Sequence, residues 1–232
     1  MEKIDKLMSL LKSKEDEAYI RRVNWIFFEE RIEEYFSSLN NAYNFDALGG
    51  LYLINNRKSN PIYNIKYLYK SNFINHIQIS TGWRRLNVYK GIVKDGVEKV
   101  EHVLESESAL VFSQGINGKI MVFLYPYKSS IASVNEENII LHLNIEPHEL
   151  TEKKISSILN TYIKYCVATS AISFDSQYLY FWRLWLIFRD FRNKQLIRNK
   201  SLYFIEKIII LFVPVLAVWA TLFTSSKWPN IW

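Results

Sequence analysis

The chain has few of the residues that disulfide-bonded and metal-binding folds require. Its 232 residues include one cysteine, Cys166, and four histidines. A single cysteine excludes an internal disulfide and a zinc site made of several thiolates, and it is typical of a reducing compartment. Because Cys166 lies among apolar residues at helical spacing, we expect a small buried side chain rather than a nucleophile.

Glycine-dependent nucleotide-binding and hydrolase motifs are missing as well. The seven glycines form no Walker-type Gly-Lys-Ser/Thr loop, no GxGxxG and no GxSxG. Among the histidines, only His142 and His148 lie near each other, and Pro147 separates them. A metal-binding pair would instead share one face of a helix. The sequence therefore predicts a protein without enzymatic activity, without a cofactor and without a metal site.

Negative charge is scarce towards the C-terminus. The whole chain has a formal net charge of +6. Residues 176–232 hold eight lysines and arginines against two acidic residues, a difference of +6, so this segment alone matches the whole excess. Anionic lipid headgroups attract such a polybasic segment by about 1 kcal/mol per cation. The basic character of the chain therefore indicates a membrane surface rather than nucleic acid.

One long stretch contains no charged residue. Ile208–Ser226 is apolar on every face and lies between Lys207 and Lys227. As a helix it would be roughly 28 Å long, which matches the hydrocarbon thickness of a bilayer. A buried helix of a soluble core is the alternative, but such a helix seldom needs apolar residues all round. We therefore predict a transmembrane helix at 204–226 and a short tail at 227–232.

The cations predict the orientation of this span. Seven lysines and arginines lie from Arg183 to Lys207, whereas only Lys227 follows the span. The positive-inside rule then puts the N-terminal domain in the cytoplasm, as in a single-pass, tail-anchored protein of a bacterial inner membrane. A hairpin of two spans that begins near Ala168 is the alternative. It would bury Asp175 and Arg183, and it would place the N-terminal domain on the other side.

Residues 1–40 are predicted to form a helical arm in two pieces. The first piece has four apolar residues at helical spacing: Ile4, Leu7, Met8 and Leu11. The polar run Ser13–Glu17 interrupts this pattern. As an alternative, the short arm before Ser13 packs against the same arm of a second copy of the chain. A broad apolar face then follows at Tyr19, Val23, Ile26, Phe27, Ile32, Tyr35 and Phe36. A solvated acidic face is expected at Glu29, Glu30, Glu33 and Glu34.

Residues 41–171 are predicted to form an α+β soluble domain for sensing or interaction. Turn residues divide a β-rich stretch into short segments that are rich in Ile, Val and Tyr. The expected strands are Leu51–Ile54, Ile65–Tyr69, Phe73–Ile79, Leu86–Val93, Ala109–Gln114, Lys119–Tyr127 and Ile139–Ile145. Gly115-Ile116-Asn117-Gly118 predicts a hairpin turn. Val97–Glu105 is expected to be a strand, with a helix as the alternative.

A helix is predicted to begin after Thr151 and to cover one face of the antiparallel sheet. Its apolar positions recur at intervals of three and four residues: Ile155, Ile158, Leu159, Tyr162, Ile163, Cys166 and Val167. The predicted fold class is therefore α+β. It comprises an N-terminal helical arm, an antiparallel β-rich domain with a packed amphipathic helix, and a C-terminal transmembrane helix.

Residues 172–203 are predicted to form an interfacial helix and a basic connector. Tyr178–Phe188 is aromatic and includes Trp182, Arg183 and Trp185. At about 16 Å this segment is too short to cross a bilayer. Trp, Tyr and Arg favour the headgroup region, so we expect these three residues to contact the membrane and to take part in gating.

A candidate binding site lies in the β-rich half. Trp83-Arg84-Arg85 follows a predicted turn, and an aromatic plane beside two guanidinium groups is able to stack a base and pair a phosphate. Arg57 and Lys58 lie in the same basic half. Solvated strand and loop cations are the alternative interpretation. If these side chains converge, the expected ligand is a nucleotide or a short oligonucleotide.

The chain has Trp83-Arg84-Arg85 in a soluble domain, and the predicted span Ile208–Ser226 follows this domain in the sequence. This layout resembles the transmembrane effectors of bacterial antiphage signalling systems. The resemblance implies nucleotide sensing, homo-oligomerisation, ion conduction and a partner protein from the same system. In the span, Pro214 permits a kink that a gating helix can use, and we group Trp219 with it. The expected function is a non-enzymatic effector that opens or disrupts the lipid bilayer in antiviral defence. A tail-anchored scaffold or adaptor is the alternative.

Overall fold

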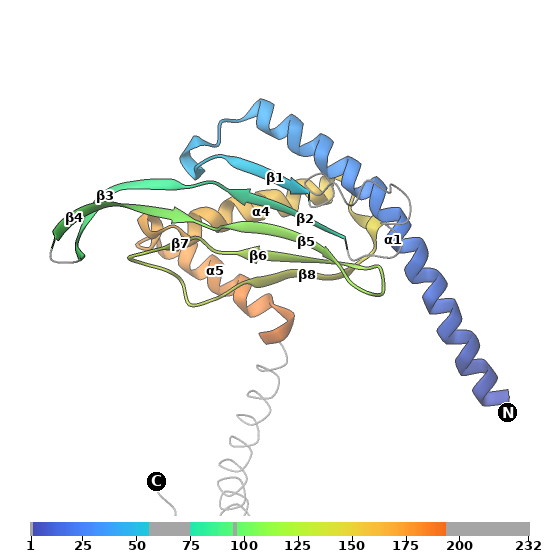
Figure 1. Ribbon diagram of the computed structural model, residues 1–232. Helices are drawn as coiled ribbons and strands as arrows, with labels where there is room; N and C mark the ends of the chain where they lie inside the picture. The colour runs from blue at the N-terminus through green and yellow to red at the C-terminus, as the bar shows by residue number, and fades with distance from the viewer. Residues whose placement is uncertain (1, 56–74, 95–96, 194–232) are drawn as a thin grey trace, which may run out of the picture. The chain divides into compact units, whose positions relative to one another are not determined.

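The computed structural model describes residues 2–55, 75–94 and 97–193. It shows a mixed α+β fold with antiparallel sheets and an N-terminal helix (Figure 1). The chain divides into two compact units, Met1–Ile187 and Phe188–Trp232, and the fold below is that of the first. The predicted strand Ile65–Tyr69, the cations Arg57 and Lys58, and the span with Pro214 and Trp219 lie outside the described residues.

Helix α1 is a single helix, Glu2–Ala42, so the predicted break at Ser13–Glu17 is wrong. Ion pairs between side chains stabilise the helix across this polar run. The Nζ atom of Lys14 lies 2.9 Å from a carboxylate oxygen of Glu17, and Arg21 lies 3.0 Å from the same carboxylate. Ion pairs three and four residues apart stabilise a helix without any apolar contact.

The buried face of α1 differs from the predicted one. Five apolar residues of α1 are buried: Ala18, Trp25, Phe28, Ile32 and Phe36. Their spacing keeps them on one side of the helix, whereas Tyr19 and Phe27, which were predicted to be on the buried face, are exposed. The prediction that Glu29 faces solvent is also wrong, because Glu29 is buried and accepts a hydrogen bond of 2.6 Å from Asn55.

The larger sheet has five antiparallel strands in the order β1-β2-β5-β6-β8. The strands are β1 Leu51–Asn55, β2 His76–Thr81, β5 Ala109–Gln114, β6 Ile120–Tyr125 and β8 Ile139–Ile145. The predicted limits of β5 and β8 are confirmed to the residue. The predicted hairpin between β5 and β6 is also confirmed, and Gly118 in its turn has a φ of +75°.

The smaller sheet has the order β3-β4-β7 and consists mainly of a long two-stranded ribbon. Its strands are β3 Arg84–Lys94, β4 Val97–Ser106 and β7 Lys128–Ser129. The strand prediction for Val97–Glu105 is thereby confirmed. Pairing of β3 with β4 is irregular between Arg85 and Tyr89, and Asn87 there has a φ of 56°, as in a bulge.

Helix α4, Glu152–Thr169, packs into the same core as α1 and the five-stranded sheet. The predicted apolar positions are buried or partly buried except Val167, which is exposed, and Tyr165 is buried in addition. Thr151 is the residue before the helix, as predicted, although its side chain makes no capping hydrogen bond. A one-sided apolar face thus places α4 along the sheet (Figure 1).

Short 3-10 turns and one further helix complete the described part. The turns are η1 Asp46–Leu48, η3 Pro147–Glu149 and η4 Ala171–Ser173. Helix α5 covers Gln177–Arg189 and confirms the helix predicted at Tyr178–Phe188. Among residues 2–55, 75–94 and 97–193, no helix combines the length and apolar character that a bilayer span needs.

Candidate functional site

A buried carboxylate lies where the β3–β4 ribbon meets the end of α4. Glu105, near the end of β4, is only 1% exposed. A charged side chain is rarely found at such depth unless ion pairs and hydrogen bonds replace the lost hydration. The partners of Glu105 therefore define a local site, which we call the Glu105 cluster: Arg84, Glu105, Ser170 and the backbone N–H of Ala171.

Three donors surround this carboxylate. A guanidinium nitrogen of Arg84 lies 3.1 Å from Oε2 of Glu105. The hydroxyl of Ser170 lies 3.0 Å from the same oxygen, and the backbone nitrogen of Ala171 donates to Oε1 at 2.5 Å. Arg84 also donates to the Ser170 hydroxyl at 2.7 Å, so that hydroxyl accepts from one partner and donates to the other.

The Glu105 cluster joins elements that are distant in sequence. Arg84 is the first residue of β3, immediately after the Gly82-Trp83 turn, whereas Ser170 ends α4 and Ala171 begins η4. Hydrogen bonds to a charged group are about twice as strong as neutral ones, so this contact fixes the ribbon to the α4–α5 connection. Displacement of Arg84 would therefore disturb Ser170 and Ala171, which begin the segment that leads into α5.

The structure separates the residues of the predicted binding site. Trp83 is 75% exposed and Arg85 is exposed, as a ligand contact requires. Arg84 is half-buried and shared between Glu105 and Ser170. Arg84 thus has a structural contact that the sequence did not indicate, while the side chains of Trp83 and Arg85 are exposed to solvent.

Further buried polar contacts lie around Ser108, three residues after Glu105 in the sequence. The backbone oxygen of Ser108 accepts from the Tyr162 hydroxyl at 3.0 Å, and its Oγ lies 3.2 Å from the Cys166 sulfur. Burial raises the pKa of Cys166 to about 12. The thiolate, which is the nucleophilic form, is therefore negligible near neutral pH. The expectation that Cys166 is buried is confirmed.

Helix α5 has one side on the domain and one side in solvent. Lys164 of α4 lies 4.5 Å from the ring centre of Trp182, and Arg183 lies 3.3 Å from a carboxylate oxygen of Glu136. Leu186 is buried on this side. The opposite side exposes the aromatic residues Phe181 and Trp185. The predicted membrane contacts thus fall into two groups, with Trp185 outward and with Trp182 and Arg183 at the domain.

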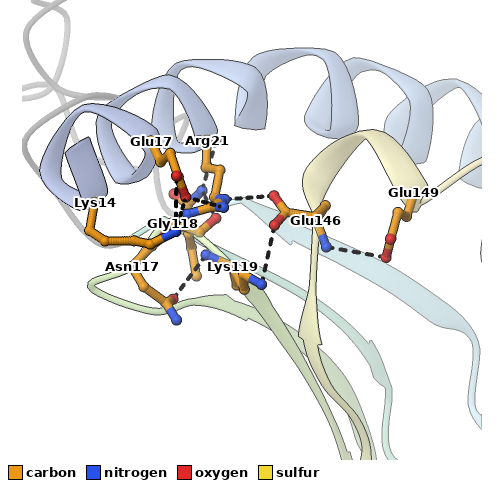
Figure 2. Close-up of polar contacts among 9 residues, drawn as sticks. Lys14, Glu17, Arg21, Asn117, Gly118, Lys119, Glu146 and Glu149 are labelled. Carbon is orange, nitrogen blue, oxygen red and sulfur yellow. Dashed lines mark hydrogen bonds and ion pairs between the residues drawn. The ribbon is translucent and has the colours of Figure 1, made fainter. Parts of the chain in front are cut away.

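A polar network fixes α1 to the β5–β6 turn (Figure 2). Arg21 pairs with Glu146 at 2.7 Å and with Glu17 at 3.0 Å, and Lys119 reaches the other oxygen of Glu146 at 3.2 Å. Gly118 lies directly against α1, because a Cβ atom built on it would be 2.5 Å from Cβ of Arg21. This network marks the position at which α1 leaves the domain.

Acidic pH is expected to weaken this attachment. Burial acts to raise the pKa of Glu146, but hydrogen bonds from Arg21 and Lys119 outweigh it and hold the pKa below its usual 4.5. The ionised carboxylate therefore stabilises the fold fully above pH 4.5, and this contribution disappears as pH falls through the lowered pKa. Glu146→Gln should cost about 1 kcal/mol at pH 7 and clearly less at pH 3, measured by urea unfolding. An equal cost at both pH values would contradict this assignment.

Sequence reasoning missed Glu105 and Ser170. Glu105 belongs to the run VEKVEHVLES, where charged residues alternate as they do on a solvated ribbon, and Ser170 follows a helix without any motif. Their 65-residue separation leaves no local signal. Within the described residues, no three His, Cys, Asp or Glu side chains are grouped as a metal site would need. Comparisons of the chain with protein-family models, curated proteins and solved structures gave no match.

Proposed function

We propose that the chain is a non-enzymatic membrane effector in which a small anionic ligand acts at the β2–β3 turn and α5 passes the change to an apolar C-terminal span. The observation that carries this proposal is the Glu105 cluster. It connects Arg84, in the predicted sensing turn, with Ser170 and Ala171, which precede α5.

The chemistry of Arg84 gives the proposal a mechanism. A phosphate offers a guanidinium group the same paired oxygens as a carboxylate does. A nucleotide phosphate held by Arg85 and a base stacked on exposed Trp83 would compete with Glu105 for Arg84. Withdrawal of Arg84 leaves the buried Glu105 carboxylate short of one positive partner, which destabilises its hydrogen bonds to Ser170 and Ala171.

The two-sided surface of α5 supports a role at the membrane. Its outward aromatic residues, including Phe181 and Trp185, are of the kind that favour the headgroup region, and its inward residues attach it to the domain. Helix α5 directly precedes the basic connector and the span Ile208–Ser226 in the sequence. A displaced α4–α5 connection would thus act on the span through a short linker.

The test is ion flux through liposomes that contain the full-length chain. We expect potassium efflux that rises when a nucleoside triphosphate mixture or a short single-stranded oligonucleotide is added. Arg85→Gln should abolish the rise, whereas Lys128→Gln, which changes an exposed cation of β7, should leave it unchanged.

A second variant separates an effector from an adaptor. Replacing Ile208–Ser226 by an unrelated apolar segment of equal length should keep the chain in the liposome but abolish flux. If the native chain shows no flux with any of these probes, or if flux survives this replacement, the effector proposal is wrong. Absence of flux from the native chain would favour the alternative, a tail-anchored adaptor.

A further inference from the structure

The first four turns of α1 carry an apolar stripe that none of the described residues covers. Every side chain from Lys3 to Asp16 is exposed. Five large apolar residues among them are 54–64% exposed, and they define the stripe: Ile4, Leu7, Met8, Leu10 and Leu11. A lone helical segment of this length is marginal in water, and its stability normally comes from packing of an apolar face. The stripe therefore has the character of an interaction surface.

A cavity continues the stripe onto the domain. It has a volume of about 820 Å³ and lies between α1 and the β5–β6 turn. Its α1 wall is formed by Lys14, Glu15, Ala18 and Arg22. These positions follow Leu11 at intervals of three and four residues, so they lie on the same side of α1 as the stripe. The opposite wall includes Ile116, whose side chain is 83% exposed.

We infer that the stripe and the cavity of one copy bind the N-terminal part of α1 from a second copy of this chain. The two α1 helices then pack as an antiparallel pair. In this arrangement Leu7 of each copy lies opposite Leu11 of the other. The first turn of each copy, with Ile4, then reaches the level of Lys14 at the mouth of the other copy's cavity. Both apolar surfaces are covered by one symmetric contact, as a two-fold dimer requires.

Charge decides between the antiparallel and the parallel arrangement. At the flank of the seam between the two helices, the antiparallel pair brings Lys3 beside Glu17 of the second copy. It also brings Leu10 beside Leu10 of the second copy. A parallel pair in the same seam would put Lys14 against Lys14 and Leu10 against Glu15. The first arrangement adds Lys3 to the cations that already pair with Glu17, Lys14 and Arg21, and keeps the apolar side chains together. The second sets like charges in contact.

Charge also favours a second copy over a lipid surface. Residues 2–17 contain five acidic residues against four lysines, a net charge of −1. Glu15 lies on the side of the stripe, where it would meet an anionic headgroup layer directly. This self-association goes beyond the proposed effector function and does not depend on the ligand or on ion flux.

Cysteine crosslinking of the full-length chain in detergent tests the contact and its direction. The native Cys166 is fully buried, so it gives no background with a maleimide. Leu10→Cys should crosslink to itself with a short bis-maleimide. Lys3→Cys should not, because the two positions lie roughly 20 Å apart in the antiparallel pair, but it should crosslink to Glu17→Cys in a mixed sample.

A matched pair of substitutions shows whether the stripe makes the contact. In the Leu10→Cys background, Leu7→Asp should lower the crosslinking yield at least tenfold, since an unpaired buried carboxylate costs more than the roughly 1.4 kcal/mol that a factor of ten represents. Ser9→Asp, on the opposite side of α1, should leave the yield unchanged. Circular dichroism of each variant verifies that the fold is intact.

Three outcomes would overturn the inference. The first is a Leu10→Cys thiol that reacts with a monofunctional maleimide but never crosslinks. The second is self-crosslinking of Lys3→Cys, which would indicate a parallel pair. The third is loss of crosslinking with Ser9→Asp as well as with Leu7→Asp. Protection of the Leu10→Cys thiol by anionic vesicles without any crosslink would assign the stripe to a lipid surface instead.

Discussion

Replacing Glu105 by alanine is expected to lower the free energy of unfolding by about 3–5 kcal/mol, because it removes one member of a buried ion pair. Arg84 and Ser170 would lose their shared acceptor, and the backbone N–H of Ala171 would have no carboxylate to bind. Water is not well placed to replace it, since Glu105 is 1% exposed. Chemical denaturation at pH 7 measures the effect.

The matched control is an exposed ion pair in the neighbouring strand. Lys128 of β7 lies 2.8 Å from Glu107, and both side chains are about 60% exposed. Lys128→Ala should therefore cost less than about 1 kcal/mol. Similar costs for the two substitutions would show that the Glu105 cluster is not an important contact between the ribbon and α4.

A double-mutant cycle isolates the role of Arg84. Arg84→Ala alone leaves a buried carboxylate without its cation and should also destabilise strongly. If the two residues act as one unit, adding Arg84→Ala to Glu105→Ala should cost little more than the single change. Additive losses would mean that Glu105 is held mainly by Ser170 and Ala171, which would weaken the proposed ligand competition at Arg84.

Local patterns were sufficient to predict β5, β8 and α4. Short runs of apolar residues between turn residues identify β5 and β8. The apolar spacing of α4 predicts most of its buried positions. These elements are determined by residues within a short window, which is the information a sequence displays directly.

Contacts between distant segments could not be predicted in this way. The buried face of α1 is decided by what the helix meets, so Ala18 and Phe28 are covered while Phe27 remains in solvent. Glu105 resembles its charged neighbours in sequence, and only the approach of Ser170 makes it a buried site. At Trp83-Arg84-Arg85, local chemistry likewise suggested donors and could not reveal that Arg84 has an internal partner, Glu105.

Gly118→Ala is expected to destabilise the fold by about 2–4 kcal/mol through the contact between the β5–β6 turn and α1. The φ of +75° at Gly118 costs an L-residue about 1–2 kcal/mol, and overpacking adds about 1–3 kcal/mol. The new Cβ would lie 2.5 Å from Cβ of Arg21 and 2.7 Å from the backbone oxygen of Ala18. Neither neighbour is the end of a flexible side chain, so relief requires α1 to move.

The same turn provides its own control. A Cβ on Gly115 would approach the side-chain oxygen of Asn117 at 3.2 Å, and that side chain is able to rotate away. Gly115→Ala should therefore cost less than about 1 kcal/mol. Amide hydrogen exchange gives the second measurement, because displacement of α1 by Gly118→Ala should reduce protection around Arg21 more than in α4. Equal destabilisation by the two substitutions, with protection of α1 unchanged, would show that the turn does not hold the helix.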